Sequence, residues 1–179
     1  MRRKLIPNAA YPSEVVDDIQ VRVERLGATL VRLSYVATGR IDRIVLAPPA
    51  HPLRTDKLWE KTCFEAFLAP VSGPSYREFN FSPSGQWATY QFSAHRKGMV
   101  QAALPAPPEI EVARESCRLG ITVTFSPDLP FEPYRLGLSA VIEEEGGVRS
   151  YWALDHPPGA PDFHDPSCFA LELPAATGK

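Results

Sequence analysis

Apolar and polar residues alternate with a period of two along most of this chain. Such alternation places successive side chains on opposite faces of a strand, one face toward a core and the other away from it. Clusters of Pro and Gly separate the alternating segments at short intervals, as turns do. We therefore predict about ten or eleven strands. They are placed at residues 19–26, 28–39, 40–47, 58–69, 76–82, 86–93, 109–115, 117–125, 134–145, 148–155 and 168–173.

Proline usage strengthens the prediction of an all-β protein. The chain has 19 prolines among 179 residues, and they gather in stretches that read as loops. Because proline interrupts helices, no long amphipathic helix pattern survives between the clusters. Many short strands with frequent turns are typical of an antiparallel β-sandwich. We expect a single domain over residues 1–179, with its core from about residue 15 to residue 173.

Composition and charge exclude several classes of partner. The net charge is −2 and Lys and Arg are scattered, so nothing attracts the chain to nucleic acid. No segment approaches the roughly 20 apolar residues of a membrane span, and the start, MRRKLIPNAAYPSE, lacks the apolar run of a signal peptide. We expect a cytoplasmic protein with neither a nucleic-acid nor a membrane partner. The oligomeric state is left open.

The segment YREFNFSPSGQWATYQFS, residues 76–93, is typical of a hairpin. Pro83 and Gly85 suit the second and fourth positions of the turn. On the core face we expect the aromatic residues Phe79, Phe81, Tyr90 and Phe92. The opposite face would then carry Glu78, Asn80, Trp87, Thr89 and Gln91. That second face is too aromatic for a plain solvent face and too polar for a core.

Residues 58–69 show the same mixture on one of their two faces. The set that alternates with the apolar core positions is Trp59, Lys61, Cys63, Glu65 and Phe67. If the two segments are neighbours, five residues converge on one sheet face: Trp59, Glu65, Asn80, Trp87 and Gln91. Aromatic rings stack on the C–H face of a sugar, and Glu, Asn and Gln hydrogen-bond its hydroxyl groups. The alternative is that a loop covers this face and satisfies its polar groups internally.

A second concentration of functional side chains lies in YWALDHPPGAPDFHDP, residues 151–166. We expect this loop to close one end of the ligand site, with Trp152 or Phe163 as a second aromatic plate and His156 and His164 beside it. The spacing of its His and Asp residues matches no strong metal signature. The sequence also lacks the common hydrolase, phosphate-loop and dinucleotide-binding motifs, so we assign no catalytic residue and no metal ligand.

Three stretches together resemble the bacterial DOMON-like domains akin to family 9 carbohydrate-binding modules: LWEKTCFEAFLAP, YREFNFSPSGQWATYQFS and SYWALDHPPGAPDFH. The resemblance covers roughly residues 15–173. It implies a β-sandwich of jelly-roll type that binds a sugar or a haem. Trp59 and Glu65 match the sugar-binding pattern of that family best. Haem-binding relatives use Met and His as iron ligands, and no motif here supports Met99 in that role.

The leading prediction is a non-catalytic domain that binds a carbohydrate or a related small polar ligand, with no cofactor. One alternative is a small hydrolase or isomerase that uses Glu65 and a histidine of the 155–166 loop. The other is a DOMON-type protein that binds haem or a metal ion. The predicted ligand-binding residues are Trp59, Glu65, Asn80, Trp87, Gln91, Trp152, His156, Phe163 and His164.

Overall fold

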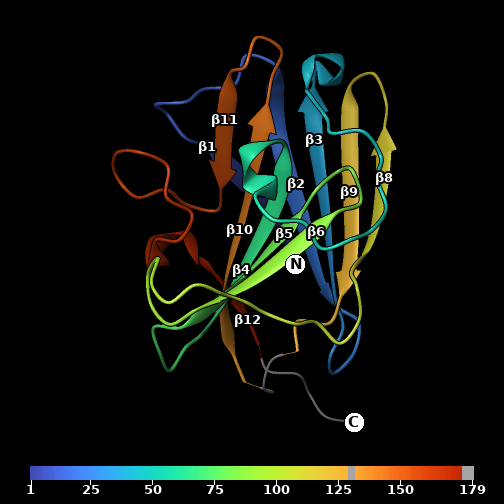
Figure 1. Ribbon diagram of the computed structural model, residues 1–179. Helices are drawn as coiled ribbons and strands as arrows, with labels where there is room; N and C mark the ends of the chain where they lie inside the picture. The colour runs from blue at the N-terminus through green and yellow to red at the C-terminus, as the bar shows by residue number, and fades with distance from the viewer. Residues whose placement is uncertain (129–131, 175–179) are drawn as a thin grey trace.

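The computed structural model describes residues 1–128 and 132–174, which form an all-β protein with one 12-stranded antiparallel sheet (Figure 1). The strands are β1 (Arg2–Pro7), β2 (Val16–Arg25), β3 (Val31–Gly39), β4 (Cys63–Pro70), β5 (Tyr76–Phe81), β6 (Trp87–Phe92), β7 (Val100–Gln101), β8 (Glu109–Arg114), β9 (Arg118–Phe125), β10 (Tyr134–Glu143), β11 (Arg149–Ala153) and β12 (Leu171–Leu173). Short 3-10 helices lie between some of them: η1 (Ile41–Arg43), η2 (Leu58–Glu60) and η3 (Pro166–Cys168).

The sheet is continuous but curls into two halves. Its strand order is β7-β6-β5-β4-β10-β11-β1-β2-β3-β9-β8, and β12 pairs with β10. Strand β1 pairs with β11 on one side and with β2 on the other, so it joins the two halves. We call them the β4 half, which contains β4–β7 and β10–β12, and the β3 half, which contains β2, β3, β8 and β9. In Figure 1, β5 and β6 run across the direction of β3 and β9. The expected sandwich-like packing is present, while the jelly-roll subtype stays a prediction.

The main core lies between the two halves. The rings of Phe79 and Phe81 from β5 contact Phe125 of β9, with centroids 4.9 and 5.2 Å apart. Tyr35 of β3 is fully buried, and its hydroxyl donates a hydrogen bond of 2.7 Å to the carbonyl oxygen of Glu65 in β4. This bond satisfies a polar group inside the core and ties the back of β4 to the opposite half.

The two halves differ in what covers their outer faces. Burial alternates along β3 and β9, as expected for strands with one face in solvent. Strands β4 and β10 are buried at nearly every position, so both of their faces are covered. A second apolar cluster covers the outer face of the β4 half, where Phe67 stacks on Phe169 and Tyr76 stacks on Phe92. The C-terminal loop supplies much of this cover.

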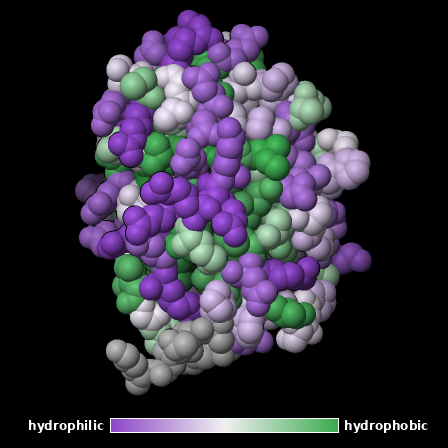
Figure 2. All heavy atoms as spheres, turned by 180° about the vertical axis from the view of Figure 1, so that it is seen from behind, coloured by the Kyte–Doolittle hydropathy of each residue, from purple (hydrophilic) through white to green (hydrophobic). Residues whose placement is uncertain are grey.

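Polar residues dominate the surface seen from behind in Figure 2, with apolar residues visible in gaps between them. No helix in the described ranges is long and apolar enough to cross a lipid bilayer.

Several strand boundaries differ from those expected. Residues 40–47 form η1 followed by an isolated bridge at Ile44, not a strand. Strand β1 was missed, because five of its six residues are exposed and its sequence, RRKLIP, shows no apolar alternation. Residues 58–69 begin with η2 and turn before β4 starts at Cys63, so Trp59 lies outside the strand. Long-range pairing, which local alternation does not report, decides these cases.

The expected faces of the β5–β6 hairpin are wrong for β6. The hairpin pairs Phe81 with Trp87 and Glu78 with Tyr90. Residues opposite each other share a face, so Trp87, Thr89 and Gln91 lie on the side of Phe79 and Phe81. The other side carries Glu78, Asn80, Tyr90 and Phe92.

The turn between β5 and β6 explains this reversal. The Gly85 amide donates to the Ser82 carbonyl at 3.0 Å, and the Ser82 amide donates to the Gln86 carbonyl at 2.9 Å. These bonds enclose a three-residue loop, in which Gly85 adopts a φ of 91°. A hairpin loop of this kind shifts the register by one residue relative to a two-residue loop, and that shift moves every side chain to the other face.

Candidate ligand-binding pocket

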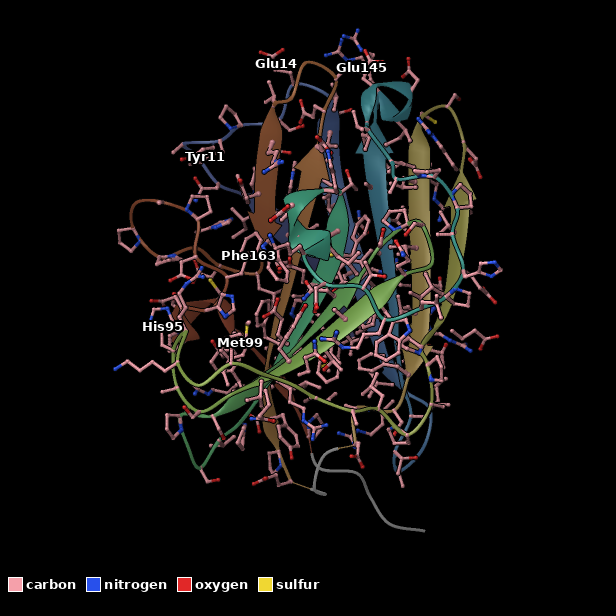
Figure 3. All side chains as sticks on the ribbon, viewed as in Figure 1. Tyr11, Glu14, His95, Met99, Glu145 and Phe163 are labelled. Atoms are coloured by element: carbon pink, nitrogen blue, oxygen red, sulfur yellow. The ribbon has the colours of Figure 1, made fainter. Side chains whose placement is uncertain are left out.

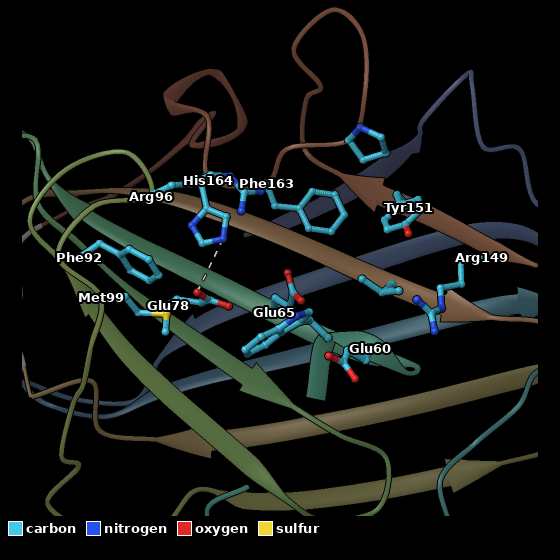
Figure 4. Close-up of a pocket in the computed structure, with 13 residues that line it drawn as sticks. Glu60, Glu65, Glu78, Phe92, Arg96, Met99, Arg149, Tyr151, Phe163 and His164 are labelled. Atoms are coloured by element: carbon cyan, nitrogen blue, oxygen red, sulfur yellow. Dashed lines mark ion pairs between the residues drawn. The ribbon is translucent and has the colours of Figure 1, made fainter. Parts of the chain in front are cut away.

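A cavity of about 620 Å³ opens on the outer face of the β4 half (Figure 4). Its floor comes from β4 and β5, and its walls come from η2, β11 and the loops after β6 and β11. Aromatic, acidic and basic side chains line it together. The aromatic lining consists of Trp59, Phe92, Tyr151, Phe163 and the imidazole of His164.

Two carboxyl groups form the polar floor of the cavity. Glu65 and Glu78 are only 3% and 5% exposed. In the β4–β5 register Glu65 pairs with Asn80, so the two glutamates are diagonal neighbours on one face. Ser139 Oγ donates a 3.0 Å hydrogen bond to Glu65 Oε2, and Asn80 Nδ2 donates a 2.7 Å bond to Glu78 Oε1. Each carboxyl group therefore has one oxygen held by a neighbouring side chain on the same face of the sheet.

Burial makes both carboxyl groups hold their protons more tightly than usual. Burial, together with the nearby charge of Glu78, raises the pKa of Glu65 to about 8. Burial also raises the pKa of Glu78 to about 7, although the bond from Asn80 and the charge of Arg96 oppose the rise. The floor therefore presents both protonated and ionised carboxyl groups near neutral pH.

His164 is a neutral imidazole above this floor. Burial, reinforced by the charge of Arg96, lowers its pKa to about 4. The Arg96 amide donates to the Tyr76 hydroxyl at 3.1 Å, and that hydroxyl lies 2.8 Å from His164 Nδ1. We assign Tyr76 as the donor to Nδ1, which leaves the ring proton on Nε2. Nε2 faces Glu78 Oε2 at 3.8 Å (Figure 4).

One carboxylate joins the two loops that frame the cavity. Asp162 Oδ1 accepts hydrogen bonds from Arg96 Nη2 at 2.7 Å and Nε at 3.0 Å, and Asp162 Oδ2 lies 2.8 Å from His95 Nε2. Burial would raise the pKa of Asp162, but these hydrogen bonds outweigh it and hold the pKa below its ordinary value. The joined loops bring Met99 and Phe163 to the same side of the molecule, near His95 (Figure 3).

Trp59 forms part of the wall contributed by η2. Lys57 adopts a left-handed φ of 63° just before the helix, which turns the chain out of the preceding loop. Trp59 then packs edge-on against Tyr90, with centroids 5.8 Å apart. In Figure 4 Glu60, the next residue of η2, lies on the opposite side of Glu65 from Phe163. The η2 wall and the C-terminal loop thus face each other across the carboxyl floor.

Four of the sequence-predicted site residues line this cavity: Trp59, Glu65, Phe163 and His164. Asn80 shares the face of Glu65 and Glu78 as expected, but it is fully buried and does not line the cavity; its side chain holds Glu78. His156 does not line the cavity. Its Nε2 lies 2.8 Å from the Ile6 carbonyl oxygen, so it braces the C-terminal loop against β1.

The other three predicted residues point away from the cavity. Trp87 and Gln91 lie on the inner face of β6, for the register reason given above. Trp152 is 2% exposed in the main core, and its indole N–H donates to Ser150 Oγ at 3.1 Å. Its neighbour Tyr151 faces the cavity instead. The expectation that Trp87 and Gln91 share a face with Glu65 is therefore wrong, as is the expectation that Trp152 forms an aromatic plate of the site.

Sequence reasoning missed several residues of the lining. They are Glu60, Glu78, Phe92, Arg96, Met99, Val141, Arg149, Tyr151 and Pro161. For Phe92 and Tyr151 the signal was present as alternation, because each is one position away from a residue assigned to the site. Glu78 was assigned to the correct face but not to the site. The loop residues Arg96 and Met99 carried no periodic signal.

The sequence left open two alternatives, a Glu–His enzyme and a haem or metal protein, and the contacts that each would need can be checked in the structure. Within the described ranges, no hydrogen bond joins Glu65 to His156 or His164, so the contact expected for a Glu–His catalytic pair is not formed. Across the same residues, no three His, Cys, Asp or Glu side chains gather as the ligands of a metal ion would.

Comparisons with known proteins point to a fold rather than to a family. No protein-family model matches the chain, and a search of curated proteins found no similar sequence. Among solved structures, a putative carbohydrate-binding protein from Bacteroides uniformis matches 94% of this chain and 83% of its own, with a TM-score of 0.68 and 15% identity. A family 9 carbohydrate-binding module from Caldicellulosiruptor kristjanssonii, in complex with glucose, matches 84% of this chain and 72% of its own, with a TM-score of 0.53 and 6% identity. This chain is thus similar in fold to carbohydrate-binding proteins.

Proposed function

We propose that the cavity binds a carbohydrate or a related small polar ligand, without catalysing its conversion. One observation carries the proposal: the buried carboxyl group of Glu65 faces a cavity whose walls include Trp59, Tyr151 and Phe163. A sugar ring needs apolar surface for its C–H face and polar groups for its hydroxyls. The cavity offers both within about 620 Å³, which is within the range of small-ligand pockets.

The protonation states of Glu65 and Glu78 suit hydrogen bonding to the hydroxyl groups of a sugar. A protonated carboxyl group donates one hydrogen bond and accepts others, whereas a carboxylate only accepts. With pKa values of about 8 and about 7, Glu65 and Glu78 supply both kinds of partner near neutral pH. A sugar hydroxyl also both donates and accepts, so either state of the floor has a partner on the ligand.

The fold similarity supports the same class of ligand. The two solved structures named above are carbohydrate-binding proteins by their descriptions, and one of them holds glucose. Transfer of that role to this chain is part of the proposal, as is the DOMON-like relationship suggested by the sequence. The side chains of the cavity support a carbohydrate ligand independently of the fold similarity, because they belong to this chain.

Calorimetry with simple sugars, supported by a glycan array, tests the proposal. We expect Trp59→Ala to weaken binding by at least about tenfold while the fold survives, since the side chain is half-buried on a short helix. Glu65→Gln should also weaken binding, and Glu111→Gln, a matched change at an exposed position of β8, should not. The proposal fails if no mono- or oligosaccharide binds the folded wild-type protein. Release of a changed sugar during incubation would instead indicate catalysis.

A further inference from the structure

Within the described ranges, no Lys or Arg side chain hydrogen-bonds to either carboxyl group of the floor, although the charge of Arg96 is near enough to lower the pKa of both. Glu65 Oε2 accepts from Ser139, but no hydrogen bond to Glu65 Oε1 is present among the described residues. Since Glu65 is 97% buried and lines the cavity, this unpaired oxygen is accessible from the cavity alone. Among the residues that the structure describes, the polar partner of Glu78 Oε2 is the neutral imidazole of His164, at 3.8 Å. Buried carboxyl groups are ordinarily paired, so this arrangement calls for a partner.

Two arginines line the cavity, Arg96 and Arg149, and neither forms a hydrogen bond with the floor carboxyl groups in the described part of the chain. Arg96 lines the cavity, but Asp162 holds its guanidinium through two hydrogen bonds. In Figure 4 Arg149 lies beyond Glu65, on the side away from Glu78. Glu60 of η2 adds a third acidic group to the lining, so the acidic side chains outnumber the basic ones. The remaining groups packed on the floor are neutral near pH 7: the hydroxyls of Tyr76 and Ser139, the amide of Asn80 and the thiol of Cys63.

We propose that the ligand carries a protonated amine, as an amino sugar does, and that its ammonium group sits between Glu65 and Glu78. The inference rests on the proposed carbohydrate function and narrows it to one substrate class. An ammonium group has three donors and no acceptor, which matches the unpaired Glu65 Oε1 and the exposed side of Glu78. Charge-assisted bonds of this kind are about twice as strong as neutral ones. The aromatic walls then receive the apolar faces of the ring.

Binding of a cation has a consequence that a neutral sugar does not share. A positive charge next to both carboxyl groups favours their ionised forms, so protons held by the floor leave for solvent when the amine enters. The amine itself stays protonated, the carboxyl protons pass to solvent or buffer, and no covalent bond of the ligand changes. Release of protons on binding therefore distinguishes a cationic ligand from a neutral one.

Titration calorimetry of the wild-type protein with glucosamine, glucose and N-acetylglucosamine tests the inference. The measurement is made at pH 7 in two buffers that differ in ionisation enthalpy. We expect glucosamine to bind at least about tenfold more tightly than the two neutral sugars, and to release protons that the neutral sugars do not. In Glu78→Gln the preference for glucosamine should shrink while glucose binding persists, and Glu111→Gln should leave the preference unchanged.

The outcomes separate the two proposals. If glucose or N-acetylglucosamine binds as well as glucosamine, the amine inference is overturned and the carbohydrate function stands. If none of these sugars nor any oligosaccharide binds, the proposed function fails and the inference fails with it. The comparison among the three sugars uses only the wild-type chain, so it remains decisive even if Glu78→Gln does not fold.

Discussion

Replacement of Glu65 by glutamine should change how stability depends on pH. Glutamine has nearly the same shape, and its carbonyl oxygen can accept the hydrogen bond that Ser139 Oγ donates. What disappears is a titrating group. In the folded protein the pKa of Glu65 is raised from 4.5 to about 8 by burial and by the charge of Glu78. We expect the variant to lose less stability than the wild type as the pH rises.

The sign and size follow from proton linkage. Between pH 4.5 and about 8 the folded state holds the Glu65 proton more tightly than the unfolded state does. The free energy of unfolding therefore falls as pH rises through this window, by up to about 1.4 kcal/mol per pH unit for one group. Glu78, with a pKa of about 7, adds a second fall of the same sign over a narrower window. From pH 5 to pH 7 the variant should thus gain up to about 3 kcal/mol relative to the wild type.

Urea unfolding followed by tryptophan fluorescence at several values between pH 5 and pH 8 measures this difference. His164 acts in the opposite direction. Because its pKa is lowered to about 4, the stability it contributes is lost as pH falls from 6.5 toward 4. That contribution is common to both proteins and cancels in the comparison. Glu111→Gln, exposed on β8, should give a curve parallel to the wild type. If the Glu65→Gln curve is also parallel, Glu65 is not a proton-holding buried group and the reasoning is refuted.

Three further changes test other parts of the structure. Gly39→Ala should cost several kcal/mol, because Gly39 has a φ of 141° and an added Cβ would collide with the Val15 carbonyl oxygen; an unchanged melting temperature would contradict this. Phe81→Ala should lower the free energy of unfolding by about 3–5 kcal/mol, since the ring is fully buried; a loss below about 1 kcal/mol would place it outside the core. Tyr76→Phe should cost about 1–3 kcal/mol and shift the ¹⁵N resonance of His164 Nδ1, which loses its donor; an unshifted resonance would reject the assigned tautomer.

Alternation along the chain was enough to predict an antiparallel β-protein and most of its strands. It also assigned the two faces of β4 correctly, with Phe64 toward the core and Glu65 away from it. It failed in β6 because the turn before it contains three residues, and one residue decides which face each side chain takes. Alternation reports two faces but does not say which of them is the inner one. That limit also exchanged Trp152 with Tyr151.

The rest of the site depends on contacts between distant segments. His164 meets Tyr76 across 88 positions of sequence, and Asp162 meets Arg96 across 66. These pairs form because the C-terminal loop folds back over the outer face of β5, a path that no local pattern specifies. The histidine, the aspartate and Phe163 were all visible in the sequence as a polar and aromatic loop. Their partners, Tyr76 in β5 and Arg96 in the loop after β6, could not be identified from the sequence.

Strand β4 is buried on both faces, with the core on one side and the cavity on the other. Point substitutions there act on one side at a time, so the ligand site can change through Glu65 while Phe64 and Ala66 keep the fold. The insertion or loss of a single residue within the strand acts differently, because it exchanges the two sides beyond that point. Polar groups would then enter the core, and apolar groups would floor the cavity. We therefore expect divergence of this protein to proceed along β4 by replacement, with changes in length confined to its flanking loops.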